Sequence, residues 1–121
     1  MIGLSEIRAI AMGLPQVEEG PPVRAARRVA DFKVAGKSFV GVEAGGRSMT
    51  LSLPEEEVRA LAAENPEAYE EIWRNGEKLV GLRVDLSRVS ARRARQLIEI
   101  SWRHNAPGRP RVVNRRSKDK C

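Results

Sequence analysis

Apolar and polar residues alternate in three short consecutive segments between residues 31 and 53. A period of two is typical of half-buried β-strands, because successive side chains of a strand point to opposite faces of a sheet. Residues 35–37 and 44–47 separate the segments, and their glycines allow the positive φ that tight hairpins need. The pattern predicts an antiparallel meander, joined by a later strand over residues 79–86 whose apolar side carries Val80, Leu82, Val84 and Leu86.

Helical periodicity flanks these strands at both ends of the chain. Residues 4–14 carry one apolar stripe, and residues 91–105 carry another behind Ser90, whose hydroxyl is a good N-cap. A sheet with one apolar face needs such helices to cover it. The sequence therefore predicts a two-layer α+β sandwich over residues 1–106, with one antiparallel sheet and the N- and C-terminal helices packed on one face.

The segments between these elements have weaker patterns. Ser52 stands three residues before a glutamate, which predicts a capping box at the start of an acidic helix. Residues 67–73 are predicted to form a short helical turn, and residues 16–29, which have no convincing period, are expected to be irregular. Trp73 and Trp102 are in step with neighbouring apolar residues, which predicts that both are core anchors.

The net charge of +6 is unevenly distributed along the 121 residues. Residues 1–102 carry 15 basic and 15 acidic side chains, whereas residues 103–121 carry 7 basic side chains and 1 acidic one. Residues 107–121 also have few apolar side chains, so burial there cannot offset the entropy lost on ordering. We therefore expect residues 107–121 to form a flexible basic tail outside the domain.

Cysteine usage and hydropathy indicate the compartment. The single cysteine is the last residue, Cys121, so no intramolecular disulfide can form, as in proteins of a reducing cytoplasm. No apolar run approaches the roughly 20 residues of a membrane span, and the N-terminus lacks the order of a signal peptide. These features predict a cytoplasmic protein with no membrane partner.

Residue patterns for catalysis are poorly represented in the chain. The one histidine, His104, is expected at a helix end, and without a second histidine or an internal cysteine no metal site is predicted. No serine stands on a glycine-flanked strand-to-helix elbow, and the glycines match neither phosphate-loop pattern. The sequence therefore predicts a protein that is not an enzyme, with no catalytic residue and no cofactor.

Basic side chains offer a binding chemistry instead. A flexible basic tail can follow a phosphate backbone without a preformed groove, and arginines at a hairpin tip and on the last helix extend the same chemistry. The same charges also suit a solubilising tail, an alternative that the sequence leaves open. The candidate nucleic-acid-binding residues are Arg47, Arg92, Arg93, Arg95, Arg109, Arg111, Arg115, Arg116, Lys118 and Lys120.

Several local strings are similar to those of a known family. They are Leu14-Pro15-Gln16-Val17-Glu18-Glu19, Phe32-Lys33-Val34-Ala35-Gly36-Lys37-Ser38-Phe39, Leu51-Ser52-Leu53-Pro54, Ser101-Trp102 and Ala106-Pro107. Over about residues 4–107 the sequence resembles the MmcQ/YjbR family of small bacterial proteins, which are described as DNA-binding. The resemblance implies a CyaY-like (frataxin-like) α+β fold and nucleic acid, DNA rather than RNA, as the partner. It carries no catalytic or base-reading residue over to this chain.

A rival hypothesis rests on the acidic half of the chain. Residues 55–77 carry eight acidic side chains against two arginines, Arg59 and Arg74. Such a segment suits a non-catalytic protein-interaction or regulatory module with a protein partner. The resemblance to the frataxin-like fold would add an acidic ridge with weak cation binding. The sequence does not decide between the two hypotheses, nor does it define an oligomeric state.

Overall fold

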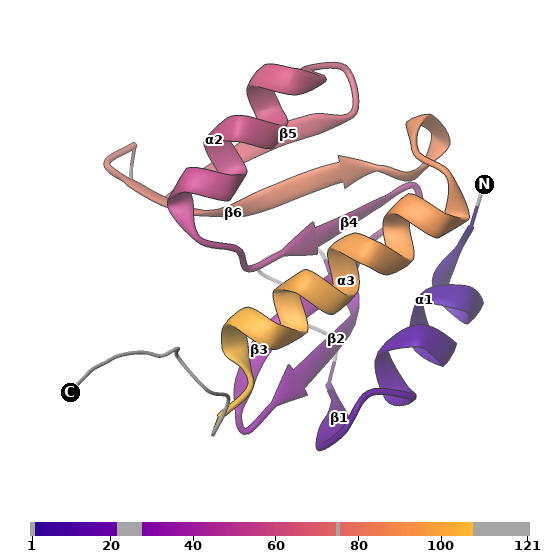
Figure 1. Ribbon diagram of the computed structural model, residues 1–121. Coiled ribbons are helices and arrows are strands. Elements are labelled where there is room, and N and C mark those ends of the chain that lie inside the picture. The colour runs from indigo at the N-terminus through magenta and orange to yellow at the C-terminus, as the bar shows by residue number, and fades with distance from the viewer. Residues whose placement is uncertain (1, 22–27, 75, 108–121) are drawn as a thin grey trace, which may run out of the picture.

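The computed structural model describes residues 2–21, 28–74 and 76–107 and contains one sheet and three α-helices (Figure 1). The elements are α1 (Leu4–Met12), β1 (Val17–Gly20), β2 (Arg28–Val34), β3 (Lys37–Glu43), β4 (Ser48–Leu51), α2 (Glu55–Glu64), β5 (Tyr69–Arg74), β6 (Lys78–Asp85), the 3-10 turn η2 (Leu86–Arg88) and α3 (Ala91–Asn105). The predicted α+β class, meander, acidic helix and terminal helices are confirmed.

The sheet has six strands in the order β1-β2-β3-β4-β6-β5, and every neighbouring pair is antiparallel. The meander β2-β3-β4 occupies the middle, as predicted, and β6 joins it beside β4. In the register, Met49 lies between Val42 and Val84, so one face of the sheet forms a continuous apolar surface. All three side chains are fully buried.

The three helices pack on that apolar face (Figure 1). α3 crosses the middle of the sheet and buries Ala94, Leu97 and Ile98. Ser101 allows a close approach, since its Oγ lies 2.6 Å from the carbonyl oxygen of Phe39 and 2.8 Å from that of Ser52. The prediction that the terminal helices share one face is confirmed, and α2 covers the β5-β6 side of the same face.

Two segments form strands where the sequence predicted none. Within residues 16–29, expected to be irregular, Val17–Gly20 pairs with β2, while residues 22–27 lie outside the described residues. Residues 67–73 were predicted to be helical, but Tyr69–Arg74 pairs with β6 along its whole length. Both predictions were wrong because long-range pairing outweighs the local pattern, which was short in one case and resembled a helical spacing in the other.

Two side-chain assignments also need correction. Trp73 is not a core anchor: it is 41% exposed, its ring centroid lies 5.5 Å from the Arg59 guanidinium, and its indole N–H donates to Glu71. Trp102 does pack against the core while its Nε1 donates to Pro15 O. The capping box at Ser52 is wrong as well, because the α2 N-cap is Pro54, with no side-chain cap.

A bulge explains why the apolar pattern of β6 is only partly correct. Leu82, Val84 and Leu86 are fully buried as predicted, but Val80 is half-buried and Leu79 lies in the core instead. The β5-β6 register shifts at this point, so β6 has one extra residue between Leu79 and the next paired position. The extra residue moves Val80 out of the covered face.

The bulge yields a test of the register by substitution at Val84 and Val80. Val84→Asp should lower the free energy of unfolding by more than about 3 kcal/mol, because a buried carboxylate there has no partner. Val80→Asp, the matched control, should cost about 1 kcal/mol or less because the side chain is half-buried on the other face. Urea unfolding followed by circular dichroism measures both. Equal losses would contradict this assignment of the two faces.

Candidate functional site

Three arginines of α3 project to solvent without an ion pair. Arg92, Arg95 and Arg103 are exposed, and none of them lies within ion-pair distance of a carboxylate among residues 2–21, 28–74 and 76–107. Arg93 differs, because it is half-buried and its Nε donates to the Tyr69 hydroxyl at 3.2 Å. Arg93 is therefore held by a hydrogen bond to Tyr69, whereas the other three arginines of α3 are available to a ligand.

Arg47 lies at the same end of the molecule as the start of α3. It is exposed in the β3-β4 turn, and its carbonyl oxygen accepts a hydrogen bond from Leu86 N at 2.9 Å. Leu86 opens η2, which leads directly into α3, so the turn and the helix start are neighbours (Figure 1). We call Arg47, Arg92, Arg95 and Arg103 the arginine line.

The tail, residues 107–121, follows α3 in the sequence. The chain leaves α3 at the end opposite to the β3-β4 turn (Figure 1). A helix of 15 residues is about 22 Å long, so this end is one helix length from the start of α3. The arginine line therefore runs from the β3-β4 turn along α3 toward the start of the tail. The remaining candidates lie outside the described residues: Arg109, Arg111, Arg115, Arg116, Lys118 and Lys120.

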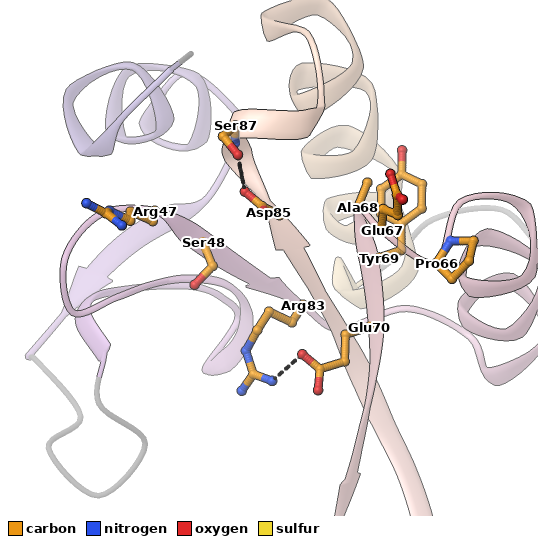
Figure 2. A pocket seen from close by; sticks show the side chains of 10 residues that line it. All are labelled: Arg47, Ser48, Pro66, Glu67, Ala68, Tyr69, Glu70, Arg83, Asp85 and Ser87. Carbon is orange, nitrogen blue, oxygen red and sulfur yellow. Dashed lines mark hydrogen bonds and ion pairs between the residues drawn. The ribbon is translucent and has the colours of Figure 1, made fainter.

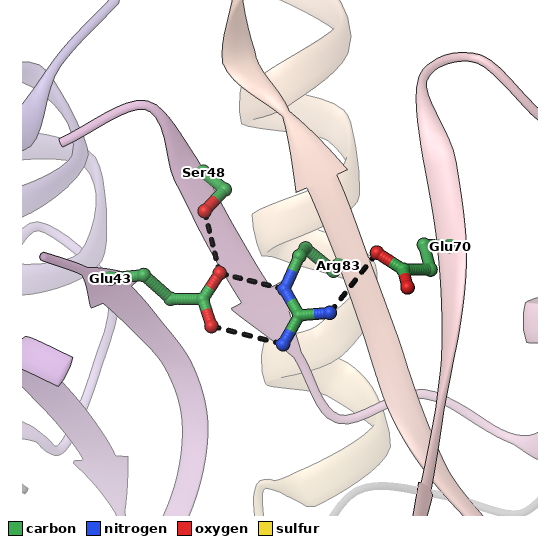
Figure 3. A network of polar contacts seen from close by, with 4 residues as sticks. All are labelled: Glu43, Ser48, Glu70 and Arg83. Atoms are coloured by element: carbon green, nitrogen blue, oxygen red, sulfur yellow. Dashed lines mark hydrogen bonds and ion pairs between the residues drawn. The ribbon is translucent and has the colours of Figure 1, made fainter. Parts of the chain in front are cut away.

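The face of the sheet opposite the helices carries a polar network (Figure 3). Arg83 of β6 donates from Nε to Glu43 Oε1 at 2.7 Å and from Nη2 to Glu43 Oε2 at 3.1 Å. Its Nη1 donates to Glu70 Oε1 at 3.1 Å, and Ser48 Oγ donates to Glu43 Oε1 at 2.5 Å. The four side chains come from β3, β4, β5 and β6, so this network ties four strands together.

Burial and hydrogen bonding shift the pKa of Glu43 in opposite directions. Burial alone would raise the pKa of its carboxyl group, but hydrogen bonds from Arg83 and Ser48 outweigh it, and the pKa is lowered. The hydrogen bond to Glu43 also raises the pKa of Arg83. Both partners are therefore charged at neutral pH. Sequence alternation placed Arg83 on the outer face of β6, but nothing in the pattern indicated its partners.

A hollow of about 650 Å³ lies beside this network, between the β3-β4 turn and the loop before β5 (Figure 2). Its charged lining comprises Arg47, Glu67, Glu70, Arg83 and Asp85. The carboxylates are already engaged: Glu70 with Arg83, Glu67 with Arg88, and Asp85 with the Ser87 hydroxyl, which lowers the pKa of Asp85. Such a mixed lining does not favour an anion over a cation.

The acidic segment does not converge on one point. Glu55, Glu56 and Glu57 are exposed in the first turn of α2, where they suit the helix dipole, and Glu55 pairs with Arg59 at 2.9 Å. Within residues 2–21, 28–74 and 76–107 no three carboxylate, histidine or cysteine side chains are grouped as metal ligands would be. In the same residues no helix combines the length and apolar character of a membrane span.

The fold described above is that of an α+β protein whose single antiparallel sheet is covered by helices on one face. The model of the YjbR family matches residues 12–104, and the chain belongs to that family. The family resemblance seen in the sequence is thereby confirmed.

A solved structure has the same fold. The crystal structure of the Deinococcus radiodurans protein DR2400, described as a DUF419 domain, aligns with a TM-score of 0.72 and 19% sequence identity. The alignment covers 93% of this chain and 85% of the other. Comparison with curated proteins found no match. At this identity the likeness concerns the fold alone.

The network around Arg83 leads to a prediction about stability. Glu43→Gln should lower the free energy of unfolding at pH 7 by about 1–3 kcal/mol, because it removes charged hydrogen bonds at a side chain that is 16% exposed. Glu70→Gln is the control: it faces the same arginine but is 66% exposed, so the expected loss is about 0–1 kcal/mol. Urea unfolding measures both.

The same variants test the charge state of Glu43. Because the pKa of Glu43 is lowered in the folded protein, its stabilising contribution is complete above the ordinary value near 4.5 and is lost as the pH falls through the folded value. The stability difference between wild type and Glu43→Gln should therefore shrink from pH 6 to pH 3. A difference independent of pH would show that the carboxylate charge contributes nothing.

Proposed function

We propose that this protein binds nucleic acid by phosphate-backbone contacts along the arginine line, Arg47, Arg92, Arg95 and Arg103. The observation that carries the proposal is that none of these exposed arginines makes an ion pair in the described structure, while Arg8, Arg28, Arg59, Arg83 and Arg88 all do. Arg47 differs from the other three because its charge helps to lower the pKa of Asp85. A cation that is not paired within the protein is available to neutralise a phosphate.

The geometry of the arginine line suits a polyanion better than a small anion. Arg92 and Arg103 are 11 positions apart on one helix, which corresponds to about 16 Å along its axis. Double-stranded DNA carries one negative charge about every 1.7 Å of its axis, so a line of this length faces several phosphates. Contacts of this kind position a protein on a duplex and read no sequence. We propose binding with little sequence preference and no catalytic role.

DNA is the proposed partner rather than RNA. The sequence resemblance to a family described as DNA-binding supports this choice, and the unpaired arginines support the phosphate chemistry common to both. The basic tail, residues 107–121, follows the end of α3 directly and extends the positive charge. The folded part alone is expected to bind weakly, because few phosphate contacts come from the arginine line itself.

Charge reversal on α3 tests the proposal directly. Arg92→Glu with Arg95→Glu should reduce duplex affinity at least about tenfold at 50 mM salt and lower the salt slope by about 2, because two phosphate contacts are lost. Fluorescence anisotropy with a labelled duplex over a salt series measures both quantities. Arg92→Lys with Arg95→Lys should retain most of the binding, because the charges remain.

A second pair of variants controls for net charge. Lys37→Glu with Lys78→Glu changes the total charge by the same amount at two exposed lysines outside the arginine line. This variant should change affinity less than threefold. If both glutamate pairs weakened binding equally, only net charge would matter and the arginine line would have no special role.

Removal of residues 109–121 tests the contribution of the tail. This truncation deletes six basic side chains and one acidic one, so a tail that makes four to six phosphate contacts should account for about four to five units of the salt slope. The melting temperature should change little, because the core lies elsewhere. Unchanged affinity and slope after truncation would show that the tail takes no part in binding.

The rival function, a protein-interaction module, is favoured by one observation. Trp73 is 41% exposed on the acidic side of the molecule, beside Arg59 of α2, and aromatic side chains are enriched in interfaces. A basic protein partner would suit the exposed Glu56 and Glu57 nearby in the chain. Absence of duplex binding by wild-type protein at 50 mM salt would transfer the proposal to this surface.

A further inference from the structure

A second, smaller hollow of about 210 Å³ lies on the uncovered face of the sheet. Its polar lining includes Arg28 of β2, Ser38 of β3, Thr50 of β4 and Arg74 of β5. Gly81 of β6 also lines it, and a side chain at that position would clash, since a Cβ would lie 2.6 Å from Leu51 O. Arg28 and Arg74 come from strands near opposite edges of the sheet, and both line this hollow together with hydroxyl side chains.

Arg28 is held in place with its hydrogen-bonding capacity incompletely used. Its Nη1 lies 3.3 Å from Asp31 Oδ1 and 3.4 Å from Ser38 Oγ, which are long hydrogen bonds. Asp31 has a better partner, because Ser38 Oγ donates to the same carboxylate oxygen at 2.5 Å. The Nε atom of Arg28 is buried and has no partner in the described structure, which is costly for a donor in a protein interior.

The position of Arg28 depends on a glycine in the next strand. A Cβ on Gly41 would lie 2.7 Å from Arg28 Cδ and 3.0 Å from its Nε, so only glycine lets the side chain lie flat across β3. The register partner of Arg28 is Glu43, which uses both carboxylate oxygens on Arg83. No carboxylate is among the described residues that line the hollow, and the carboxylate that pairs with Arg28 is that of Asp31, whose side chain is 2% exposed.

Arg74 brings a second cation to the hollow. It is exposed at the end of β5, directly opposite Lys78 in the register, and no carboxylate pairs with it among the described residues. Like charges placed opposite each other across two strands repel, so an anion bound at Arg74 would offset this repulsion. Thr50, which is 4% exposed, makes no side-chain hydrogen bond in the described part of the chain.

We propose that this hollow binds a small oxyanion, with Arg28 and Arg74 supplying the charge and the Thr50 hydroxyl a further donor. Arginine is suited to phosphate and carboxylate because its planar fork can donate two parallel hydrogen bonds. The volume is below the range of about 300–1,000 Å³ typical of sites for whole small molecules, so a phosphate group rather than a nucleotide fits. The site does not depend on the arginine line.

Titration of the ¹⁵N-labelled full-length protein with inorganic phosphate tests this proposal. Saturable shifts of the backbone amide signals of Ser38, Thr50 and Gly81 are expected, and Arg74→Gln should weaken the apparent affinity at least about tenfold. Arg74 is exposed at the end of an edge strand, so this variant should fold even if substitution of Arg28 disturbs Asp31. Lys37→Gln is the matched control and should bind within twofold of wild type.

Further titrations distinguish a free anion from a nucleic-acid phosphodiester as the ligand, and they distinguish the oxyanion site from the arginine line. If a short duplex shifts the same amides, the ligand is a phosphodiester of nucleic acid; if only inorganic phosphate does, it is a free anion, and either result supports the site. Arg92→Glu with Arg95→Glu should leave the phosphate titration unchanged. Non-saturable shifts, or equal weakening by Arg74→Gln and Lys37→Gln, would overturn the proposal.

Discussion

Burial of one face of the six-stranded sheet is the constraint on which the rest of the structure depends. Val42, Met49 and Val84 are adjacent in three neighbouring strands and fully buried, and α3 lies across the middle of this face. An apolar surface of this size is stable only when it is removed from water, at roughly 25 cal/mol per Å². Ser101 lets the helix approach closely, because its small hydroxyl adds a hydrogen bond to the carbonyl oxygens of Phe39 and Ser52, which also accept from Ser52 N and Asn105 Nδ2.

The uncovered face of the sheet carries charged side chains instead of apolar ones. No described helix packs against it, so charged side chains there can meet water or one another, and Arg83 joins Glu43 and Glu70 across four strands. Cross-strand pairs of opposite charge stabilise a sheet, and this one is partly shielded from solvent. On the same face Arg28 has an unused donor and Arg74 has no acidic partner in the described structure, so the proposed oxyanion site lies where pairing within the protein is incomplete.

The two proposals concern different surfaces and different ligands. The arginine line runs from Arg47 in the β3-β4 turn to three arginines of α3, and none of its guanidinium groups makes an ion pair within the described residues. The oxyanion site lies on the far side of the sheet and is small. Membership of the YjbR family and the shared fold of DR2400 are consistent with either surface being used, since neither comparison identifies binding residues.

The sequence by itself determined the fold class, the meander, the acidic helix and the terminal helices, because each of these has a hydrophobic period set by local geometry. Alternation over Leu82, Val84 and Leu86 was sufficient to identify the covered face of β6. The charge arithmetic also placed the whole net charge in residues 103–121. These properties can be read locally because they need only the spacing of side chains along one segment.

Tertiary structure alone decided the remainder. β1 and β5 are strands because each pairs with a distant partner, and a bulge shifts Val80 away from Leu82, although the local pattern places them together. The sequence identified Arg47, Arg92, Arg93 and Arg95 as equivalent cations. In the folded protein Arg93 donates a hydrogen bond to the Tyr69 hydroxyl, and Arg47 lies beside the start of α3. Which charges remain unpaired depends on distances between strands and helices far apart in the chain, and side-chain spacing carries no information about those distances.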